Sequence, residues 1–510
     1  LWLLSLLRPT VHMLSTLADW LTYLESLHPK TIALGLERVA QVKQRLNLHP
    51  DFPVIVVGGT NGKGSVCAML ESILYAAGYR VGCYTSPHLL RYNERVRIAK
   101  QQVSDAELCA SFEEIERARK PLVADSQVSS LIPTFSQGER EQLPPLLSGQ
   151  AWPVLSLSKE DEGASEISLT YFEFGTLTAM HCFIEHKVDV AILEVGLGGR
   201  LDAVNVFDND CAIVTSVDID HVDYLGDTRE KIAFEKAGIF RQGRVAICAD
   251  DDVPQAIREH AKNVGAELWC IGSEFGFVQG DSTVSQPPLT PPYQGENVRS
   301  LPDKGGSGWV DVTQWNYRGL QGSRNALPIP ALRGAFQLNN ASAVLAALDV
   351  LKEKLPVSMA AVRRGLTEVQ LAGRFQFVPG KPQLILDVAH NPHAARSLAE
   401  NLANLPACPN TYAIFAMLKD KDMAGVVAAL NPHIDTWLVA GIDVPRGASS
   451  TELEQVVQQG WVNGAIKSFA NIAEAVSFAY KAAGENDRIV AFGSFYTVAE
   501  VMQARGLAAI

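Results

Sequence analysis

The segment "VVGGTNGKGSV", residues 56–66, restricts the fold of this chain more than any other stretch. It follows the apolar run Phe52–Val57 and precedes a stretch whose apolar residues recur at helical spacing. A strand, a glycine-rich turn and a helix in this order make a phosphate cradle, because N–H groups converge at the helix N-terminus and glycines let a phosphate approach. Lys63 adds a positive charge. We therefore expect the segment to bind ATP rather than to be a purely structural turn.

The spacing of this cradle differs from that of the common P-loop. In the common form Ser or Thr follows the lysine directly, whereas here Gly64 stands between Lys63 and Ser65. The cradle alone does not decide which phosphate chemistry this variant serves.

The chain is too long for one hydrophobic core, and its 510 residues are expected to form two domains. Strand-like apolar runs, tight turns and helical stretches alternate in both halves, which predicts an α/β fold with mainly parallel sheets. A helical stretch precedes residues 371–374 and a new series of strands follows them. We therefore place the boundary between a first domain, residues 1–371, and a smaller second domain, residues 372–510.

Two segments break this alternation. Residues from about 121 to 165 and from about 279 to 310 are rich in Pro, Ser, Gly and Gln and show no periodicity. We expect them to be surface insertions without regular structure. A proline-rich peptide ligand is the less favoured interpretation.

Charge, cysteines and hydropathy limit the possible functions. The net charge of −12 and the pI near 5.5 argue against a nucleic-acid partner, which needs a clustered basic face. The eight cysteines show no CxxC pair and no zinc-ligand spacing, which favours free thiols in a reducing cytoplasm. The apolar start is broken by Arg8 and Pro9 and lacks a basic n-region, so we expect neither a signal peptide nor a membrane span.

Three polar residues lie just beyond the ends of predicted strands: Ser86, Glu194 and His221. Ligands of open α/β sheets bind at such strand ends. A hydroxyl, a carboxylate and an imidazole there could together hold Mg²⁺ beside the γ-phosphate. Taken singly, each has a more ordinary explanation, since a Ser before Pro is usually a turn residue and a lone His is usually a satisfied polar group.

The second half carries candidates of its own. "LILDVAHNPHA" ends a predicted strand with Asp387 and His390 close together. We expect Asp387 to take the ribose hydroxyls or a water on the nucleotide, and His390 to reach the base or a phosphate. Arg374 is expected to swing onto the γ-phosphate and offset charge in the transition state, unless it is only a surface linker residue. The later turn "AFGSFYTV" is either a substrate anion site or a tight turn.

Short motifs follow one another along nearly the whole chain: "GTNGKGS", "TSPHL", "NERVRI", "LEVGLGGRLDA", "DHVDYLG", "EKAGIF", "GRFQ", "LDVAHNPHA" and "GSFYTVAEVM". From about Leu17 to Met502, apart from the two insertions, this ordered set resembles bacterial bifunctional dihydrofolate synthase/folylpolyglutamate synthase. That family belongs to the ATP-dependent Mur-type ligases, whose P-loop has the GKG-[ST] form. The resemblance therefore assigns the variant cradle to an amide-forming ligase.

The resemblance implies a P-loop domain of the Mur-ligase ATPase type and a Rossmann-like second domain, with the active site in the cleft between them. It implies Mg²⁺ held by Ser86, Glu194 and His221, and leaves room for a monovalent cation. The residues that it implies for ATP are Gly62, Lys63, Gly64, Ser65, Asn340, Arg374 and Asp387.

The resemblance also implies a modified lysine and a pterin site. Lys236 matches the lysine that the family carbamylates, and the carbamate would add a negative charge able to bind a second magnesium. From composition alone, Lys236 would be an ordinary surface lysine. The residues implied to contact the pterin are Thr31, Ile32, Ala33, Leu34, Thr170, Tyr171, Phe172, Glu173, Leu201, Asp202 and Ala203.

The activity implied by the resemblance is ATP-dependent addition of L-glutamate to dihydropteroate, and to the glutamate carboxylate of tetrahydrofolates, through an acyl phosphate. Lys63, Arg374 and Mg²⁺ would neutralise the phosphoryl charge, with His390 as a helper. We expect a monomer whose two domains close on the substrates and exclude water.

Other functions stay open at this point. A different Mur-type amino-acid ligase would be expected to carry a nucleotide-sugar domain before its P-loop, and only about sixty residues precede Gly59. A P-loop NTPase acting as a switch would hydrolyse ATP without glutamate and would not explain the polar strand ends of the second domain. A non-catalytic nucleotide-binding module is disfavoured by the intact Lys63 and Glu194.

Overall fold

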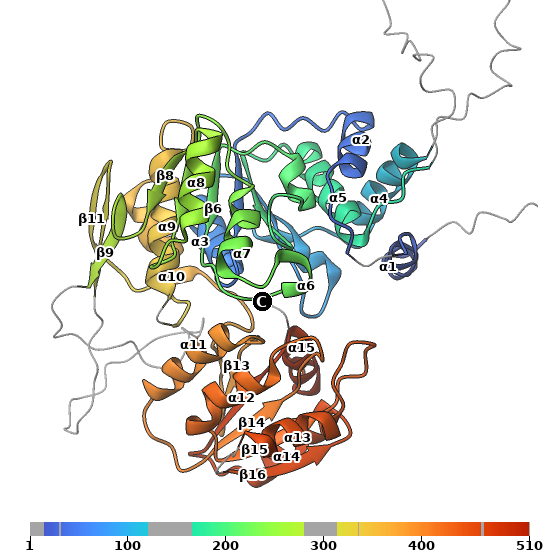
Figure 1. Cartoon of the computed structure of the whole chain (residues 1–510), viewed down its shortest axis with the longest axis vertical. Helices are drawn as coiled ribbons and strands as arrows, with labels where there is room; N and C mark the ends of the chain where they lie inside the picture. Colours follow the sequence, from blue (N-terminus) through green and yellow to red (C-terminus); the bar gives the residue numbers. More distant parts are fainter. Residues whose placement is uncertain are drawn as a thin grey trace, which may run out of the picture.

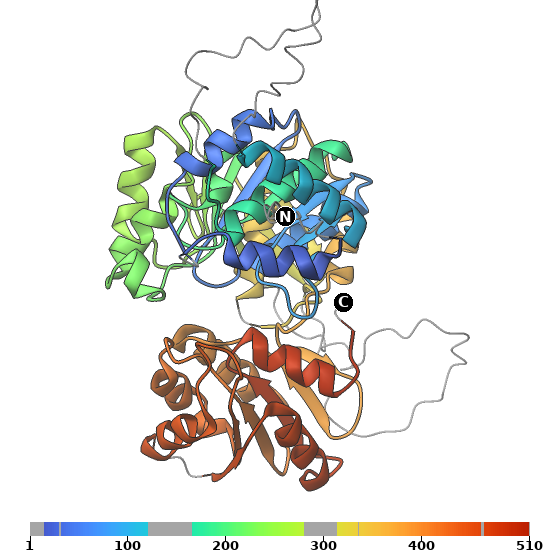
Figure 2. The same cartoon turned by 90° about the vertical axis from the view of Figure 1, so that its right-hand side faces the viewer.

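The structure is a computed structural model that describes residues 15–29, 32–120, 166–279, 314–334, 336–460 and 464–508. Its elements form two lobes that lie one above the other along the long axis (Figures 1 and 2). The first lobe carries an eight-stranded and a three-stranded sheet, and the second a six-stranded sheet. The predicted α/β class with two domains is confirmed. We call the two lobes the first and the second domain.

The first domain is built on a large and a small sheet. The strands of the large sheet are β1 (Val54–Gly58), β2 (Val81–Tyr84), β3 (Val96–Ile98), β4 (Gln101–Gln102), β5 (Val190–Glu194), β6 (Cys211–Val214), β7 (Val245–Cys248) and β8 (Glu267–Cys270). The strands of the small sheet are β9 (Phe275–Gln279), β10 (Trp315–Gly319) and β11 (Gly322–Leu327). The helices are α1 (Leu17–Ser26), α2 (Glu37–Arg45), α3 (Lys63–Ala76), α4 (Asp105–Arg119), α5 (Tyr171–Glu185), α6 (Val222–Leu225), α7 (Arg229–Ala237), α8 (Gln255–Val264), α9 (Gln337–Val350) and α10 (Met359–Glu368), with short 3₁₀ turns η1 (Tyr92–Arg95) and η4 (Ala203–Val206).

The order of strands in the large sheet is β4-β3-β2-β5-β1-β6-β7-β8. The six strands from β2 to β8 in this order pair in parallel, whereas β3 and β4 are antiparallel additions at one edge. The carboxyl ends of the parallel strands therefore meet at one edge, where ligands of such sheets bind.

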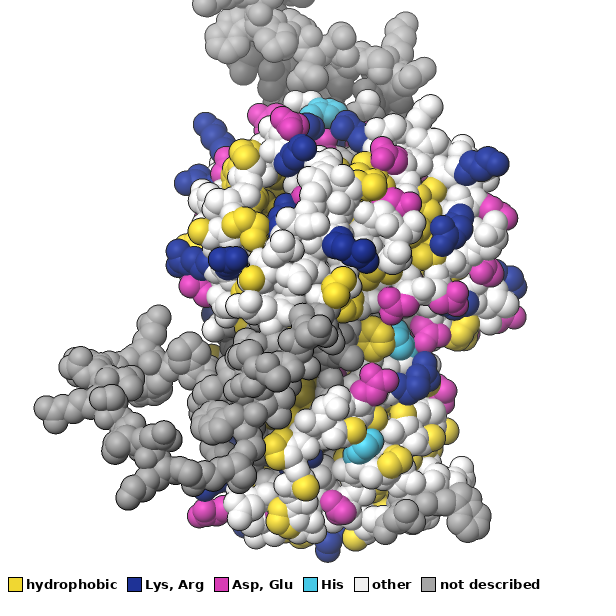
Figure 3. All heavy atoms as spheres, turned by 90° about the vertical axis from the view of Figure 1, so that its left-hand side faces the viewer, with side chains coloured by type: hydrophobic (Ala, Val, Ile, Leu, Met, Phe, Trp, Pro, Cys, Tyr) yellow, Lys and Arg dark blue, Asp and Glu magenta, His cyan; other side chains and the backbone are white. Residues whose placement is uncertain are grey.

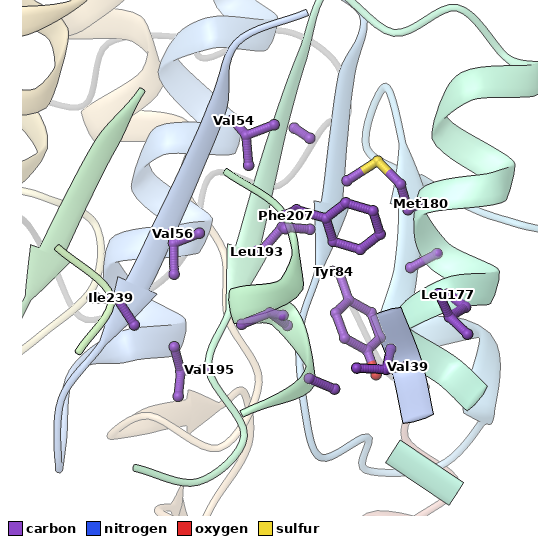
Figure 4. Close-up of a cluster of buried hydrophobic side chains, with 14 of the residues drawn as sticks. Val39, Val54, Val56, Tyr84, Leu177, Met180, Leu193, Val195, Phe207 and Ile239 are labelled. Carbon is purple, nitrogen blue, oxygen red and sulfur yellow. The ribbon is translucent and has the colours of Figure 1, made fainter. Parts of the chain in front are cut away.

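Strand β1 shows why the large sheet is buried on both faces. Successive side chains of a strand point to opposite faces. Val54 and Val56 belong to the core that includes α5, while Ile55 and Val57 belong to the core that includes α3 and α9. Figure 4 shows Val54 and Val56 in the first of these cores, together with Tyr84 and with Leu177 and Met180 from α5. Helices cover both faces of a parallel sheet in this way, so its strands are apolar throughout.

The second domain is a smaller doubly wound sheet with the order β12-β13-β17-β14-β15-β16, in which only β12 is antiparallel. Helices α11 to α13 lie on one face and α14 and α15 on the other (Figure 2). The strands are β12 (Gln376–Val378), β13 (Gln383–Leu386), β14 (Thr411–Phe415), β15 (Thr436–Ala440), β16 (Ala465–Phe469) and β17 (Arg488–Phe492). The helices are α11 (Pro392–Ala403), α12 (Met423–Leu430), α13 (Ser450–Gln459), α14 (Ile472–Ala482) and α15 (Phe495–Ala504), with the turn η5 (Asn431–His433).

Several predictions concern residues outside this description. The described residues do not include the chain start before residue 15, Thr31 or the first predicted insertion. Of the second predicted insertion they include only Gln279. The predicted boundary at residues 371 and 372 falls between α10 and β12 and stays a prediction. In the part of the chain that the structure describes, no helix has both the length and the apolar character needed to span a bilayer.

Candidate active site in the cleft between the domains

A cleft of about 910 Å³ lies between the two domains. Its walls include the P-loop and the strand ends of the first domain, and the loop after β13, α11 and the start of α15 from the second. Among the predicted site residues, Tyr171 does not line it; the Tyr171 ring packs on Tyr92 and under the guanidinium of Arg95 instead. The predicted residues that do line the cleft are Ile32, Ala33, Leu34, Gly62, Lys63, Gly64, Ser65, Ser86, Thr170, Phe172, Glu173, Glu194, Leu201, Asp202, Ala203, His221, Lys236, Asn340, Arg374, Asp387 and His390.

The P-loop connects β1 to α3 and needs its glycines. A Cβ at Gly59 would lie 1.9 Å from Oγ1 of Thr215, which leaves no room for a side chain. Gly62 has a φ of +88° and caps α3, and a Cβ there would lie 2.7 Å from Oδ1 of Asn340. Only glycine adopts this left-handed conformation without strain. The backbone N–H groups of the first turn of α3 are thus presented without a covering side chain, as an anion site requires.

Side chains from α9 complete the wall around the P-loop. Nε2 of Gln337 donates to Oγ of the buried Ser65 at 3.4 Å. Nδ2 of Asn340 donates to Oε1 of Gln337 at 3.1 Å, which holds the Asn340 amide against Gly62. The ammonium of Lys63 folds back over the loop and donates to the carbonyl oxygens of Gly59 and Thr60. The cradle is therefore preformed and carries its own cation.

Ser86 and Glu194 meet beside the cradle. The backbone N–H of Ser86 donates to Oε2 of Glu194 at 3.1 Å. Burial raises the pKa of the Glu194 carboxyl, while Lys63, the Ser86 N–H and Arg374 act against that rise. A Cβ at Gly64 would lie 3.9 Å from both Oε1 of Glu194 and Nη2 of Arg374. A buried carboxylate therefore lies within reach of the P-loop, where a bound cation would offset the cost of its burial.

His221 stands on the neighbouring loop after β6, in the left-handed conformation with a φ of +52°. Its backbone N–H donates to Oδ1 of Asp220 at 2.8 Å. Burial, with Lys421 nearby, lowers the pKa of His221 to about 4 despite the opposing effect of Asp220, so the imidazole is neutral at pH 7. A neutral imidazole, a carboxylate and a hydroxyl are a donor set that suits Mg²⁺ or Mn²⁺. Among the described residues, no three His, Cys, Asp or Glu side chains form a metal site by themselves.

Arg374 brings the second domain to the cradle. Its guanidinium stacks on the ring of Phe495 at 5.3 Å. Burial lowers the pKa of Arg374, and both Asp387 and Glu194 oppose that shift. The oxygens of Asp387 accept the N–H groups of Phe375 and Ala389, each at 2.8 Å. An arginine that stacks on an aromatic ring near the cradle can offset negative charge that develops there in a transition state.

His390 presents a free ring nitrogen to the cleft. Its Nδ1–H donates to the carbonyl of Val388 at 2.8 Å, since a carbonyl only accepts. Burial and the Lys421 ammonium lower the pKa of His390 to about 4. The Nε2 lone pair is therefore available at neutral pH, and it lies 4.0 Å from Oδ2 of Asp220.

The predicted pterin wall is held together by Arg38. Its Nη2 donates to Oε1 of Glu173 at 2.8 Å and to the carbonyl of Ala33 at 2.9 Å. The other carboxylate oxygen of Glu173 accepts the backbone N–H of Thr170 at 2.8 Å and caps α5. Glu173 is thus occupied by structural contacts, although it lines the cleft.

Two further ionisable groups lie in the first-domain wall. Burial raises the pKa of Asp202 to about 7, although backbone N–H groups of Leu197 and Val204 bond to its oxygens. Lys236 is buried, contrary to the surface position expected from composition. Burial and the charge of Lys63 lower the pKa of Lys236 to about 7. A substantial fraction of this amine is therefore neutral at physiological pH.

Several cleft residues were missed by the sequence analysis. Lys421 follows strand β14, so the strand-end argument used for Ser86 would also have found it. Its Nζ donates to Oδ1 of Asp220 at 2.7 Å. Arg38 and Asn61 carry no such signal, because their contacts depend on how distant segments pack.

Comparison with known proteins gives the class of protein. Two family models match: "Mur ligase middle domain" over residues 161–348 and "Mur ligase, glutamate ligase domain" over residues 373–495. A curated relative, dihydrofolate synthase/folylpolyglutamate synthase of Escherichia coli K12, is 39% identical over 499 residues, which cover 98% of this chain and 97% of the relative. The fold and the family matches are those of an ATP-dependent Mur-type ligase.

Solved structures agree with this assignment. Escherichia coli FolC in complex with DHPP and ADP is 40% identical, with a TM-score of 0.77 and coverage of 96% of this chain and 98% of that one. A bifunctional folylpolyglutamate synthase/dihydrofolate synthase with Mn, AMPPNP and L-glutamate bound is also 40% identical, with a TM-score of 0.76 and coverage of 97% and 98%. The chain belongs to the dihydrofolate synthase/folylpolyglutamate synthase family.

Proposed function

We propose that this chain joins L-glutamate both to dihydropteroate and to the glutamate carboxylate of tetrahydrofolates, with hydrolysis of ATP to ADP and phosphate. Its relatives carry both activities in their names. The observation that carries the proposal is the meeting of the P-loop, Glu194 and Arg374 around Gly64, because it joins a phosphate cradle, a metal-binding carboxylate and a second-domain cation at one point. We further infer that the chain acts as a cytoplasmic monomer without nucleic-acid or membrane partners.

The first chemical step activates a carboxylate. A carboxylate oxygen of the acceptor attacks the γ-phosphorus of ATP, and ADP leaves. Lys63 and Arg374 neutralise charge on the phosphoryl oxygens, while N–H groups at the start of α3 hold the phosphates. Asn340 and Asp387 are the residues we infer to hold the nucleotide from α9 and the second domain.

The second step forms the amide. The amine of glutamate attacks the carbonyl carbon of the acyl phosphate, the bond to the phosphate oxygen breaks, and the nitrogen loses a proton. We infer that His390 accepts a hydrogen bond from this amine, and the lone pair on its Nε2 at neutral pH supports this role. The cleft between the domains shields the acyl phosphate from water.

The residues that would hold the divalent ion are Ser86, Glu194 and His221. When bound there, Mg²⁺ would supply positive charge to the phosphoryl oxygens, with nucleotide and water completing its ligands.

Lys236 is proposed to carry a carbamate. The neutral amine attacks CO₂ through its lone pair and loses a proton to leave a carbamate anion. Burial supports this step because it lowers the pKa of Lys236 to about 7 and so supplies the neutral amine.

The pterin is proposed to lie between residues 32–34, the start of α5 and residues 201–203, which line the cleft from the first domain.

Phosphate release distinguishes this proposal from a P-loop NTPase and from a ligase with another acceptor. Release from ATP and Mg²⁺ would be measured with glutamate plus dihydropteroate or tetrahydrofolate, and product masses would be determined. We expect release to require glutamate and either acceptor and to vanish in Lys63→Ala. Phosphate release without glutamate would favour a nucleotide switch. Release with only one of the two acceptors would show that the chain has only the activity toward that acceptor.

A further inference from the structure

One side chain of the P-loop reaches the second domain. Nδ2 of Asn61 donates to Nδ1 of His393 at 2.9 Å and to Oδ1 of Asn391 at 3.3 Å. Nδ2 of Asn391 lies 3.4 Å from Oδ1 of Asn61 in return. Asn391 is the N-cap of α11, where its Oδ1 accepts the N–H of Ala394 at 2.9 Å. The P-loop and the first turn of α11 are therefore in direct hydrogen-bond contact across the cleft.

The backbone of Asn61 is fixed by the first domain. Its carbonyl accepts from Oγ1 of Thr215 at 2.5 Å and from Oγ of Ser216 at 3.1 Å. Its N–H donates to the same Oγ of Ser216 at 3.1 Å. Two residues later Lys63 begins α3. A movement of this loop would therefore move the Asn61 side chain with it.

The partners of Asn61 are also held firmly. The His393 ring packs edge-on against Phe336, the N-cap residue of α9 in the first domain, at 5.4 Å. Burial lowers the pKa of His393, which keeps the ring neutral and Nδ1 free to accept. Asn391 donates in addition to Oδ2 of Asp220 at 3.1 Å, so the start of α11 holds two loops of the first domain. Figure 3 shows acidic, basic and histidine side chains together where the two lobes meet.

We propose that Asn61 is a positioning residue that couples occupation of the P-loop to seating of the second domain. The proposal rests on the proposed nucleotide role of the P-loop. It adds the contact through which the second domain changes its position when the P-loop is occupied. A phosphate bound to the backbone N–H groups of the preformed loop restrains the loop further, and Asn61 then offers His393 and Asn391 a more sharply defined docking position. Asp387 and His390 lie immediately before α11 in the chain, so docking of α11 places both in the cleft.

Hydrogen exchange with inorganic pyrophosphate tests this coupling, because pyrophosphate can fill the P-loop without a base or ribose that touches the second domain. Exchange would be followed by mass spectrometry in residues 59–66 and 391–397. In the wild type we expect pyrophosphate to slow exchange in both segments. In Asn61→Ala and in His393→Phe, which keeps a ring against Phe336, protection of 59–66 should persist while protection of 391–397 is lost.

Turnover gives a second readout. Loss of this hydrogen bond should lower turnover about five- to tenfold in each single variant. The double variant should be no slower than the slower single one, because both changes remove the same contact. Glu400→Gln is the matched control, since Glu400 is an exposed residue of α11 that does not line the cleft. It should change neither readout by more than about twofold.

Each other outcome decides against the proposal. If pyrophosphate protects the P-loop of the wild type but leaves 391–397 unchanged, the two domains are not coupled. If protection of 391–397 survives in both variants, or if their effects on turnover multiply, Asn61 is not the coupling residue. If the P-loop itself gains no protection, the nucleotide role proposed for it fails first, and the coupling fails with it.

Discussion

The backbone N–H of Ser86 donates to Oε2 of Glu194 at 3.1 Å and ties the loop after β2 to the end of the adjacent parallel strand β5. This bond orients a buried carboxylate toward the P-loop, where a Cβ at Gly64 would lie 3.9 Å from its other oxygen. The bond explains how residues far apart in the sequence form one candidate metal site. Divalent-ion binding at this site should therefore depend on the negative charge of Glu194.

Glu194→Gln should remove most divalent-ion binding. The amide keeps the shape of the side chain but loses the negative charge that a divalent ion needs. We expect Mn²⁺ affinity, measured by electron paramagnetic resonance, to fall at least about tenfold, with ADP binding in EDTA nearly unchanged. Glu71→Gln is the control, because Glu71 is equally buried but pairs with Arg97. The site is misassigned if both variants bind Mn²⁺ as the wild type does.

Gly62→Ala should abolish nucleotide binding without unfolding the protein. A Cβ there would lie 2.7 Å from Oδ1 of Asn340 in addition to the left-handed strain. Gly78→Ala is the matched control, because Gly78 has a φ of +97° with nothing within 4 Å of the added Cβ. Both variants should lose about 1 kcal/mol of stability from strain. Only Gly62→Ala should weaken ADP binding in calorimetry, and equal binding by the two would refute the cradle.

Arg374→Met should lower kcat about 10²- to 10³-fold with a smaller change in KM for ATP, because Arg374 is proposed to act mainly in the transition state. Steady-state kinetics with saturating acceptor measure both quantities. Arg364→Met serves as the control, since Arg364 is exposed on α10, pairs with the exposed Glu368, does not line the cleft and should change kcat by less than about threefold. A rise in KM alone would make Arg374 a ground-state binding residue instead.

The buried Lys236 should make the free energy of unfolding depend on pH, because burial lowers its pKa. Its pKa falls from 10.5 in the unfolded chain to about 7 in the folded one, so the unfolded chain binds more protons between these values. Stability should therefore rise as pH increases through this window. In CO₂-free buffer, Lys236→Met should be more stable than the wild type at about pH 6, and this advantage should shrink by about pH 9.5. Denaturant melts measure the difference, and an advantage that is constant with pH would show that burial does not lower the pKa of Lys236.

Arg38→Met should loosen the proposed pterin wall. It leaves the buried carboxylate of Glu173 without its cation and frees the carbonyl of Ala33, at a cost of about 1–3 kcal/mol. We expect KM for dihydropteroate to rise about tenfold, while KM for ATP changes little. Arg45→Met, on the same helix, removes bonds to the carbonyls of Ala118 and Lys120, away from the cleft. If both variants raise KM for dihydropteroate equally, the effect reflects general stability.

The sequence allowed prediction of those parts of the site that depend on local pattern. Ser86 follows the apolar strand β2, Glu194 is the last residue of β5, and His221 lies on the loop after β6. The carboxyl ends of parallel strands gather at one edge. Their mutual order was not predictable, because β5 inserts between β2 and β1 and only tertiary pairing determines that position. The small sheet of β9 to β11 was missed, since its strands pair across the second predicted insertion.

Contacts between the domains were the least predictable part. Asn61 belongs to a recognisable loop, yet nothing local indicates that its side chain reaches His393 across the cleft. Lys236 resembles a surface residue in composition, and its burial depends on how α7 packs. Glu173 was predicted from the family resemblance as a pterin contact; its role there stays a prediction, because its carboxylate already caps α5 and pairs with Arg38.

Isotope transfer tests the central claim most directly. Dihydropteroate labelled with ¹⁸O in its carboxylate would be converted with ATP, Mg²⁺ and glutamate, and the released phosphate analysed by mass spectrometry. An acyl-phosphate ligase transfers one carboxylate oxygen to phosphate, so we predict one ¹⁸O in the phosphate for each amide formed. Phosphate without label, released while amide forms, would contradict the account, because the carboxylate would then have been activated by another route.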